Sequence, residues 1–153
     1  MAAATDATFV VRAAEEGDVE ALASLSAQLG YPVAIGEMRE RRARVRAARF
    51  GEIFIAVARD GAQAVVGWTH VVPRLQLEEA AHAELAGLVV DERMRGAGAG
   101  KALLAAAEDW ARAQGFAFMR VRSNVLRTRA HRFYEREGYV RIKSQAVFRK
   151  ALF

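Results

Sequence analysis

Cysteine is absent from this chain, and its absence excludes several kinds of site at once. Disulfide bonds, zinc–thiolate sites and a cysteine nucleophile all require a thiol. Histidine is scarce as well, and His70, His82 and His131 lack the spacing of metal ligands. No apolar run is long enough to span a bilayer, and the N-terminus lacks a basic start followed by a long apolar segment. We therefore expect a cytoplasmic protein with no metal and no membrane partner.

Length and charge set further limits. The 153 residues suffice for one ordinary domain with a core, and we expect a disordered lead at residues 1–7 and a single domain at residues 8–153. The formal net charge of +5 comes almost wholly from arginine and suits an anionic partner. An arginine-rich stretch at residues 39–46 is a candidate nucleic-acid site, but no aromatic residues are interleaved there. A solvated helix face is the preferred interpretation.

The spacing of apolar residues predicts an alternation of strands and helices. Strands are expected near residues 9–13, 53–58, 64–71, 82–90, 118–122, 139–144 and 146–152. Helices are expected from an N-cap at Asp18 to Gly30, at residues 35–48, from the glycine-rich loop to Gly115, and at residues 127–137. A helical crossover makes the strands near 84–90 and 118–123 parallel. The fold class is α/β, with a mixed central sheet of about six to seven strands flanked by about four helices.

The most informative segment runs from Arg95 to Lys101 and reads Arg-Gly-Ala-Gly-Ala-Gly-Lys. Its glycines leave backbone N–H groups uncovered where a helix begins, and a helix N-terminus attracts phosphate. Two phosphate-binding patterns fail here. A P-loop needs Ser or Thr in place of Ala102, and the dinucleotide fingerprint needs its third glycine at Lys101 or Leu103. The pattern Arg/Gln-x-x-Gly-x-Gly/Ala fits in full from Arg95 to Gly100.

This last pattern and its surroundings resemble the GNAT superfamily of N-acetyltransferases. Residues 84–91 resemble the family's central strand, and residues 123–139 resemble its fifth strand, fourth helix and sixth strand. The matching residues in the second segment are Ser123, Asn124, Arg127, Ala130, His131, Phe133, Tyr134, Glu135, Gly138 and Tyr139. Arg12 and the turn at residues 29–32 are also common in that family. The resemblance covers residues 8–152 and implies the same order of strands and helices.

The resemblance implies acetyl-coenzyme A as co-substrate. Its pyrophosphate would lie on the glycine loop, and its pantetheine arm would pair with the central strand. A bulge in that strand, eased by Gly87, would free a backbone N–H for the oxyanion, and Asn124 could hydrogen-bond the pantetheine amides. The implied coenzyme-binding residues are Leu88, Val89, Val90, Arg95, Gly96, Ala97, Gly98, Ala99, Gly100, Lys101, Asn124, Ala130 and Phe133.

Acetyl transfer to an amine needs a base for the ammonium proton and an acid for the leaving thiolate. The resemblance places Glu84 on the central strand as the candidate base, and the alternative is a carboxylate that merely pairs with an arginine. Tyr134 is the candidate acid, and the alternative is a tyrosine that only packs in its helix. Without a cysteine nucleophile, we expect direct transfer with no covalent enzyme intermediate.

The acceptor amine is left open. The resemblance implies an acceptor side that offers Tyr31 and Glu37, with further acidic residues at Glu40, Glu78 and Glu79. A polyamine, an aminoglycoside-like compound, an amino-acid derivative and a protein N-terminus are all compatible with it. The expected function is therefore transfer of acetyl from acetyl-coenzyme A to a primary amine of a small molecule, protein or peptide. The alternatives are a non-catalytic acyl-coenzyme-A-binding regulatory module and an arginine-rich nucleic-acid binder.

Apolar residues near the C-terminus predict a homodimer. They are Val140, Ile142, Val147, Phe148, Leu152 and Phe153. An edge strand that exposes apolar side chains is normally covered or paired, and small members of the resembling family often pair through such strands. The alternative is that these residues fold back onto the last helix.

Overall fold

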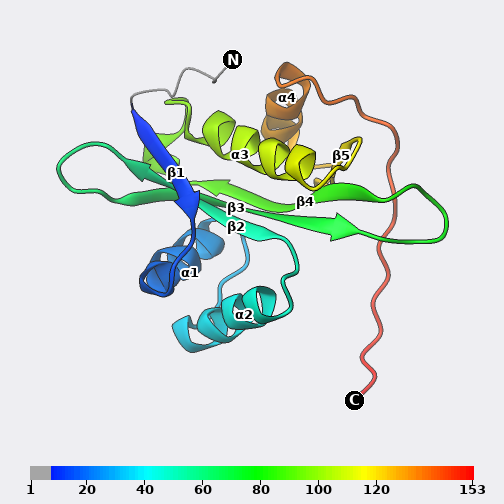
Figure 1. Cartoon of the computed structure of the whole chain (residues 1–153), viewed down its shortest axis with the longest axis horizontal. Helices are drawn as coiled ribbons and strands as arrows, with labels where there is room; N and C mark the ends of the chain where they lie inside the picture. Colours follow the sequence, from blue (N-terminus) through cyan, green and yellow to red (C-terminus); the bar gives the residue numbers. More distant parts are fainter. Residues whose placement is uncertain (1–7) are drawn as a thin grey trace. The chain divides into compact units, whose positions relative to one another are not determined.

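Residues 8–153 are described by a computed structural model (Figure 1). The lead expected at residues 1–7 lies outside the described residues. The chain forms two compact units, of which the first ends at Arg122 and the second comprises Ser123–Phe153. The single domain expected over residues 8–153 stays a prediction. Within the described range, no helix has the length and apolar character needed to cross a membrane.

In the described part of the first unit, five strands form a mixed sheet in the order β1-β2-β3-β4-β5. The strands are β1 (Phe9–Ala13), β2 (Glu52–Ala58), β3 (Val65–Arg74), β4 (His82–Val90) and β5 (Met119–Val121). Successive strands are antiparallel except β4 and β5, which are parallel. The predicted parallel pair is confirmed, and it follows from the crossover through α3 (Ala99–Ala113).

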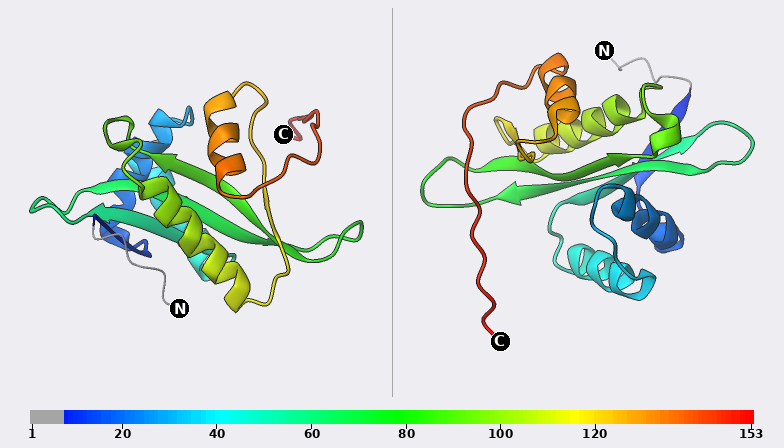
Figure 2. Two further views of the ribbon diagram at one scale, coloured as in Figure 1. Left: turned by 90° about the horizontal axis from the view of Figure 1, so that it is seen from above. Right: turned by 180° about the vertical axis from the view of Figure 1, so that it is seen from behind.

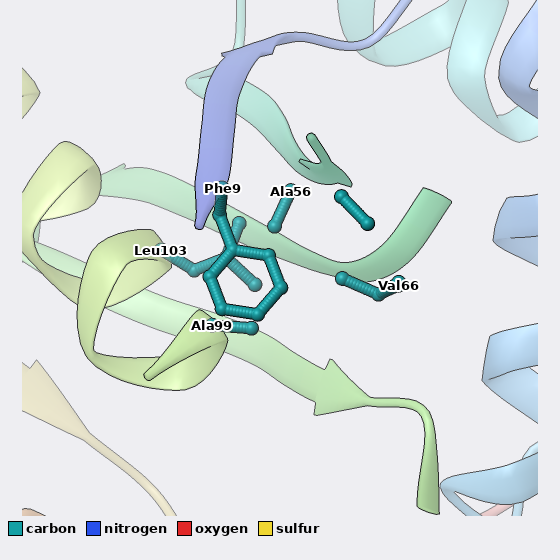
Figure 3. Close-up of a cluster of buried hydrophobic side chains, with 6 residues drawn as sticks. Phe9, Ala56, Val66, Ala99 and Leu103 are labelled. Carbon is teal, nitrogen blue, oxygen red and sulfur yellow. The ribbon is translucent and has the colours of Figure 1, made fainter. Parts of the chain in front are cut away.

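One face of this sheet is covered by α3 (Figure 1). Leu103 and Leu104 are buried, as the helical spacing of the apolar residues predicts. The cluster around Leu103 contains Phe9, Ala56, Ala58, Val66 and Ala99 (Figure 3). Full burial of one such leucine stabilises the fold by about 2 kcal/mol. The cluster anchors the first turns of α3 and so fixes the glycine loop that precedes them.

The opposite face carries α1 (Val19–Gln28) and α2 (Ile35–Ala47) (Figure 2). Leu22 of α1 packs with Ile55 of β2, and Met38 of α2 lies against the same cluster. Trp68 of β3 belongs to this cluster as well. Its register partner on β4, Val89, therefore also presents its side chain to the α1/α2 face.

Asp18 ends the 3-10 turn η1 (Glu16–Asp18) and stands at the N-cap position of α1, but its side chain does not cap that helix. Its carboxylate accepts hydrogen bonds from two Arg12 nitrogens at 2.8 and 3.1 Å and from the Glu15 N–H at 2.7 Å. Burial would raise the pKa of Asp18, but these bonds outweigh it, and the pKa is lowered. An ion pair to β1 thus replaces the expected cap bond.

The arginines of α2 are partly committed within the chain. Arg42 is buried and donates to the Ala14 carbonyl and to Glu16, both at 3.1 Å. Arg39 donates to the same Glu16 carboxylate at 2.8 Å. The expectation of a solvated helix face is therefore wrong at Arg42. These contacts also use charges that a nucleic-acid site would need.

The second unit contains α4 (Thr128–Arg136), and residues 139–153 form neither helix nor strand. The strands expected at 139–144 and 146–152 are therefore wrong. A strand persists only where a neighbour accepts its backbone hydrogen bonds, and no described strand pairs with this segment. Its apolar side chains are exposed, for example Phe148 at 92%. The predicted α/β fold class is confirmed, and residues 8–153 supply five strands to the sheet, against the expected number of about six to seven.

Candidate active site

The glycine loop connects a 3-10 turn, η2 (Glu92–Met94), to the first turn of α3. Gly96 and Gly98 have φ of 82° and 99°, which a residue with a β-carbon rarely adopts. Gly98 is the N-cap of α3, and the Ala102 N–H donates to its carbonyl at 3.0 Å. The first helical hydrogen bond of α3 is therefore donated by Ala102. The N–H groups of Ala99, Gly100 and Lys101 come before it and have no acceptor within the helix. The loop thus presents backbone donors, a positive helix end and the exposed side chains of Arg95 and Lys101 together.

The entry to this loop is held by two contacts that the sequence did not predict. Asp91 accepts hydrogen bonds from the Arg93 N–H at 3.0 Å and from its guanidinium at 3.0 and 3.3 Å. These bonds lower the pKa of Asp91. The Glu92 N–H donates to Gln28 at 3.0 Å, which ties the loop to the end of α1. The contact between Asp91 and Arg93 could have been predicted, because an Asp side chain often accepts a hydrogen bond from the backbone N–H two residues later.

β4 contains a bulge beside the predicted central-strand glycine. Gly87 pairs with His70 and Leu85 pairs with Val71, so Ala86 has no partner on β3. The Thr69 hydroxyl donates to the Gly87 carbonyl at 2.8 Å and fixes the strand at this point. The irregularity expected at Gly87 is confirmed.

Among the described residues, no strand pairs with one edge of β4 beyond the bulge. β5 pairs with β4 only at Ala83, Glu84 and Leu85. Leu88, Val89 and Val90 pair with β3 through their other edge. Their remaining backbone groups face a position where an extended ligand could add as a strand.

Glu84 lies in the part of β4 that pairs with β5, before the bulge, and its exposed fraction is 9%. Its Oε1 accepts a hydrogen bond from Nε of Arg122 at 2.8 Å, and its Oε2 lies 3.8 Å from Nε of Arg74. Glu84 pairs with Val72, which follows Trp68 by four residues on β3, so its side chain lies on the α1/α2 face. The arginine pairing considered from the sequence is thus present, and a role as base stays a proposal.

Further polar residues gather on the same face of β4 and β5. Arg120 donates to both carboxylate oxygens of Glu79, at 2.9 and 2.5 Å. The buried His82 ring stacks on Phe118 with centroids 4.8 Å apart, and its Nδ1 lies 3.0 Å from the Ala80 carbonyl. The candidate residues predicted from the sequence did not include Arg74, Arg120 or Arg122. Positions 118, 120 and 122 nevertheless have the spacing of residues on one face of a strand.

In the second unit, Tyr134 packs within α4 and against the residues that follow it. Its ring lies 5.3 Å from Phe133 and 5.9 Å from Tyr139, both edge-on. Burial raises the pKa of Tyr134 to about 12. The phenol therefore keeps its proton at neutral pH, as a general acid must.

Asn124 organises the turn before α4. Its side-chain oxygen accepts from the Leu126 N–H at 2.9 Å, and its carbonyl lies 2.9 Å from Nε2 of His131. Ala130 is half-buried on the first turn of α4. The predicted coenzyme residues of this unit thus lie on one short turn–helix segment.

The acetyltransferase (GNAT) family model matches residues 19–139, which is most of the chain. The chain belongs to the GNAT family of acetyltransferases. The match includes β4, the glycine loop, α3, β5 and α4.

Curated GNAT relatives match about half of the chain. The uncharacterized N-acetyltransferase YhdJ of Bacillus subtilis is 39% identical over 79 residues, 52% of this chain and 55% of its own length. The aminoalkylphosphonate N-acetyltransferase of Salmonella typhimurium is 46% identical over 69 residues, 45% of this chain and 44% of its own length. The matched segments thus span about half the length of these relatives.

Solved GNAT structures share the fold over nearly the whole chain. The aminoglycoside N-acetyltransferase AAC(6')-Iy in complex with CoA has a TM-score of 0.82 at 20% identity, over 93% of this chain and 94% of its own. Glucosamine-6-phosphate N-acetyltransferase from Arabidopsis thaliana has a TM-score of 0.78 at 20% identity, over 93% and 98%. At this identity the likeness establishes the GNAT fold.

The predicted acceptor-side residues lie apart from the Glu84 contacts. Tyr31 is 69% exposed after α1, and Glu37 pairs with Arg41 one turn further along α2. Among residues 8–153, no hydrogen bond or ion pair joins either of them to Glu84. The same described residues contain no group of three or more His, Cys, Asp or Glu that could hold a metal ion.

Proposed function

We propose that this GNAT protein transfers the acetyl group of acetyl-coenzyme A directly to a primary amine of a small molecule, protein or peptide. The single observation that carries the proposal is the glycine loop at the start of α3, on the same unit as the open edge of β4. The loop offers donors and charge to a pyrophosphate, and the strand edge offers backbone groups to the pantetheine amides. The relatives named above as N-acetyltransferases support the same reaction.

Each candidate residue has a role in this proposal. The pyrophosphate is held by the glycine loop, which consists of Arg95, Gly96, Ala97, Gly98, Ala99, Gly100 and Lys101. The pantetheine arm pairs with Leu88, Val89 and Val90. Asn124, Ala130 and Phe133 complete the coenzyme side. The amine nitrogen bonds to the acetyl carbon while the carbon–sulfur bond breaks. Glu84, directly or through water, takes one proton from the ammonium group before the attack. Tyr134 gives its proton to the leaving thiolate, and the second proton of the attacking nitrogen passes through water to restore Tyr134.

Coenzyme binding tests the loop assignment. Gly98→Trp places a bulky side chain on the loop at a residue with φ of 99°, so calorimetry should detect no coenzyme A binding. Gly61→Trp is the matched control, because Gly61 has open space around it and no positive φ. Thermal unfolding of both variants separates backbone strain from lost binding. Unchanged binding by Gly98→Trp would refute the loop assignment.

Glu84 has a separate test. Glu84→Gln should lower turnover at neutral pH more than at high pH, where an alkyl amine loses its proton unaided. A uniform loss at every pH would assign Glu84 a positioning role instead.

A second candidate function is a coenzyme-binding regulatory module without turnover. The observation in its favour is that both Glu84 oxygens already face arginines. Release of free thiol from acetyl-coenzyme A with a panel of amines decides between the two. Tight coenzyme binding without thiol release would support the module.

A further inference from the structure

The α1/α2 face of β4 and β5 carries an excess of positive charge beside Glu84. Arg74 and Arg122 pair with Glu84, and Arg120 pairs with Glu79. Three guanidinium groups therefore meet two carboxylates in this arginine cluster, which leaves one positive charge in excess. Arg120 is largely buried, whereas Arg74 and Arg122 keep 39% and 51% of their side chains exposed.

The strand register explains why these side chains meet. Arg120 is the parallel partner of Glu84, and Arg122 follows it by two residues on the same face. Arg74 is the β3 partner of His82, two residues before Glu84. The register of the sheet thus places the arginine cluster at the end of β4 that precedes the bulge.

The cluster has hydrogen-bond donors to spare. Arg122 uses only its Nε toward Glu84, and the Arg74 Nε lies at 3.8 Å, beyond a hydrogen bond. Nε of Arg120 is buried without a partner. Guanidinium forks match the paired oxygens of carboxylate and phosphonate groups.

We propose that the acceptor is a zwitterionic amine, with a carboxylate or phosphonate group one or two carbons from its nitrogen, bound by Arg122 and Arg74. The ammonium faces Glu84 while the anionic group faces the guanidinium groups. This arrangement rests on the proposed acetyl transfer and names the class of its acceptor. A polycationic acceptor is disfavoured, because every additional ammonium group would meet the excess positive charge of the cluster.

Matched acceptors test this assignment. 2-Aminoethylphosphonate, ethylamine and 1,2-diaminoethane share a two-carbon chain and differ in charge. We expect kcat/KM for the phosphonate to exceed that of each other amine by at least about tenfold, the effect of one good charge-assisted hydrogen-bonded pair. Equal or better use of the diamine would overturn the proposal while leaving acetyl transfer itself intact.

Substitutions at Arg122 and Arg74 test whether these two arginines cause the preference for the phosphonate. Arg122→Gln and Arg74→Gln should each raise KM for the phosphonate and reduce its advantage over ethylamine. Arg122→Glu should reverse the preference toward the diamine. Arg112→Gln is the matched control, because Arg112 forms an exposed pair with Asp109 on α3, and its preference should stay that of the parent. An undiminished preference in Arg122→Gln and Arg74→Gln would refute the assignment.

Binding decides the question even without turnover. Calorimetry with the coenzyme-A-loaded protein should detect 2-aminoethylphosphonate for the parent chain and lose the signal for Arg122→Gln. That result supports the acceptor class even if no amine is acetylated, which would count against the proposed function alone. No phosphonate binding by the parent chain would overturn the acceptor class.

Discussion

The indole ring of Trp68 lies so close to Gly87 that a β-carbon added to Gly87 would come within 2.8 Å of its Cζ3 atom. Trp68 is itself packed in the cluster around Ile55 and Leu22. Displacement of the ring would disturb this packing, so a β-carbon at the position beside the β4 bulge is disfavoured.

Replacement of Gly87 by alanine should thus destabilise the fold by about 1–3 kcal/mol, the usual cost of overpacking. It should also weaken coenzyme A binding, because the bulge sets the edge of β4. Urea unfolding and calorimetry measure the two effects. Gly36→Ala is the control, since Gly36 in α2 has open space around it and should lose no stability. The cost of Gly87→Ala should be smaller in a Trp68→Leu background than in the parent chain, and an equal cost in both would contradict the steric explanation.

Asp18 should make stability depend on pH in the acid range. Its pKa is lowered in the folded state, so its contribution is complete above the unfolded value of about 4 and is lost as the pH falls through the folded value. Asp18→Asn should cost about 1–3 kcal/mol at neutral pH and flatten the acid side of the stability curve. Asp109→Asn, which breaks an exposed pair with Arg112, is the control. Parallel acid curves for the parent chain and Asp18→Asn would refute the assignment.

Tyr134 should titrate late. Burial raises its pKa to about 12, so the folded state favours the neutral phenol, and stability falls as the pH rises from about 10 through that value. An ultraviolet titration should show a phenol that ionises at a pH of about 12, and Tyr134→Phe should remove that step. If Tyr134 is the acid, Tyr134→Phe should also lower kcat with little change in KM. A normal turnover rate would leave Tyr134 a packing residue.

The exposed C-terminal segment supports the predicted dimer. Ile142 and Phe148 are 67% and 92% exposed, and apolar groups of this kind are normally covered. Light scattering should give about twice the chain mass of 16.8 kDa. Ile142→Ser with Phe148→Ser should return the monomer, whereas Leu77→Ser, at an equally exposed position between β3 and β4, should not. A monomer mass for the parent chain would reject the dimer.

Local patterns predicted the features that local physics determines. The spacing of Leu103 and Leu104 gave the buried face of α3, and the glycines at 96 and 98 marked the turn at its start. Gly87 inside an apolar strand pointed to the bulge. Each of these signals lies within a few residues of the feature that it predicts.

Features that depend on distant partners were missed. The position of Asp18 in the sequence is typical of a helix cap, because its ion pair with Arg12 forms only in the folded chain. The apolar residues at 139–153 are typical of strands, but their pattern does not show whether another strand lies beside them. The arginine cluster forms only when β4 and β5 pair in the observed register. That register involves two distant segments, so neither segment alone predicts it.

The short pairing of β5 has a consequence for motion. β3 is hydrogen-bonded along both edges, whereas β5 has three register pairs and a single neighbour, so its local unfolding should cost less free energy. Amide protons of β5 should therefore exchange with solvent sooner than those of β3. The strand with the fewest register pairs is also the one that borders the unpaired edge of β4, so local opening of β5 would affect the place where an extended ligand would add.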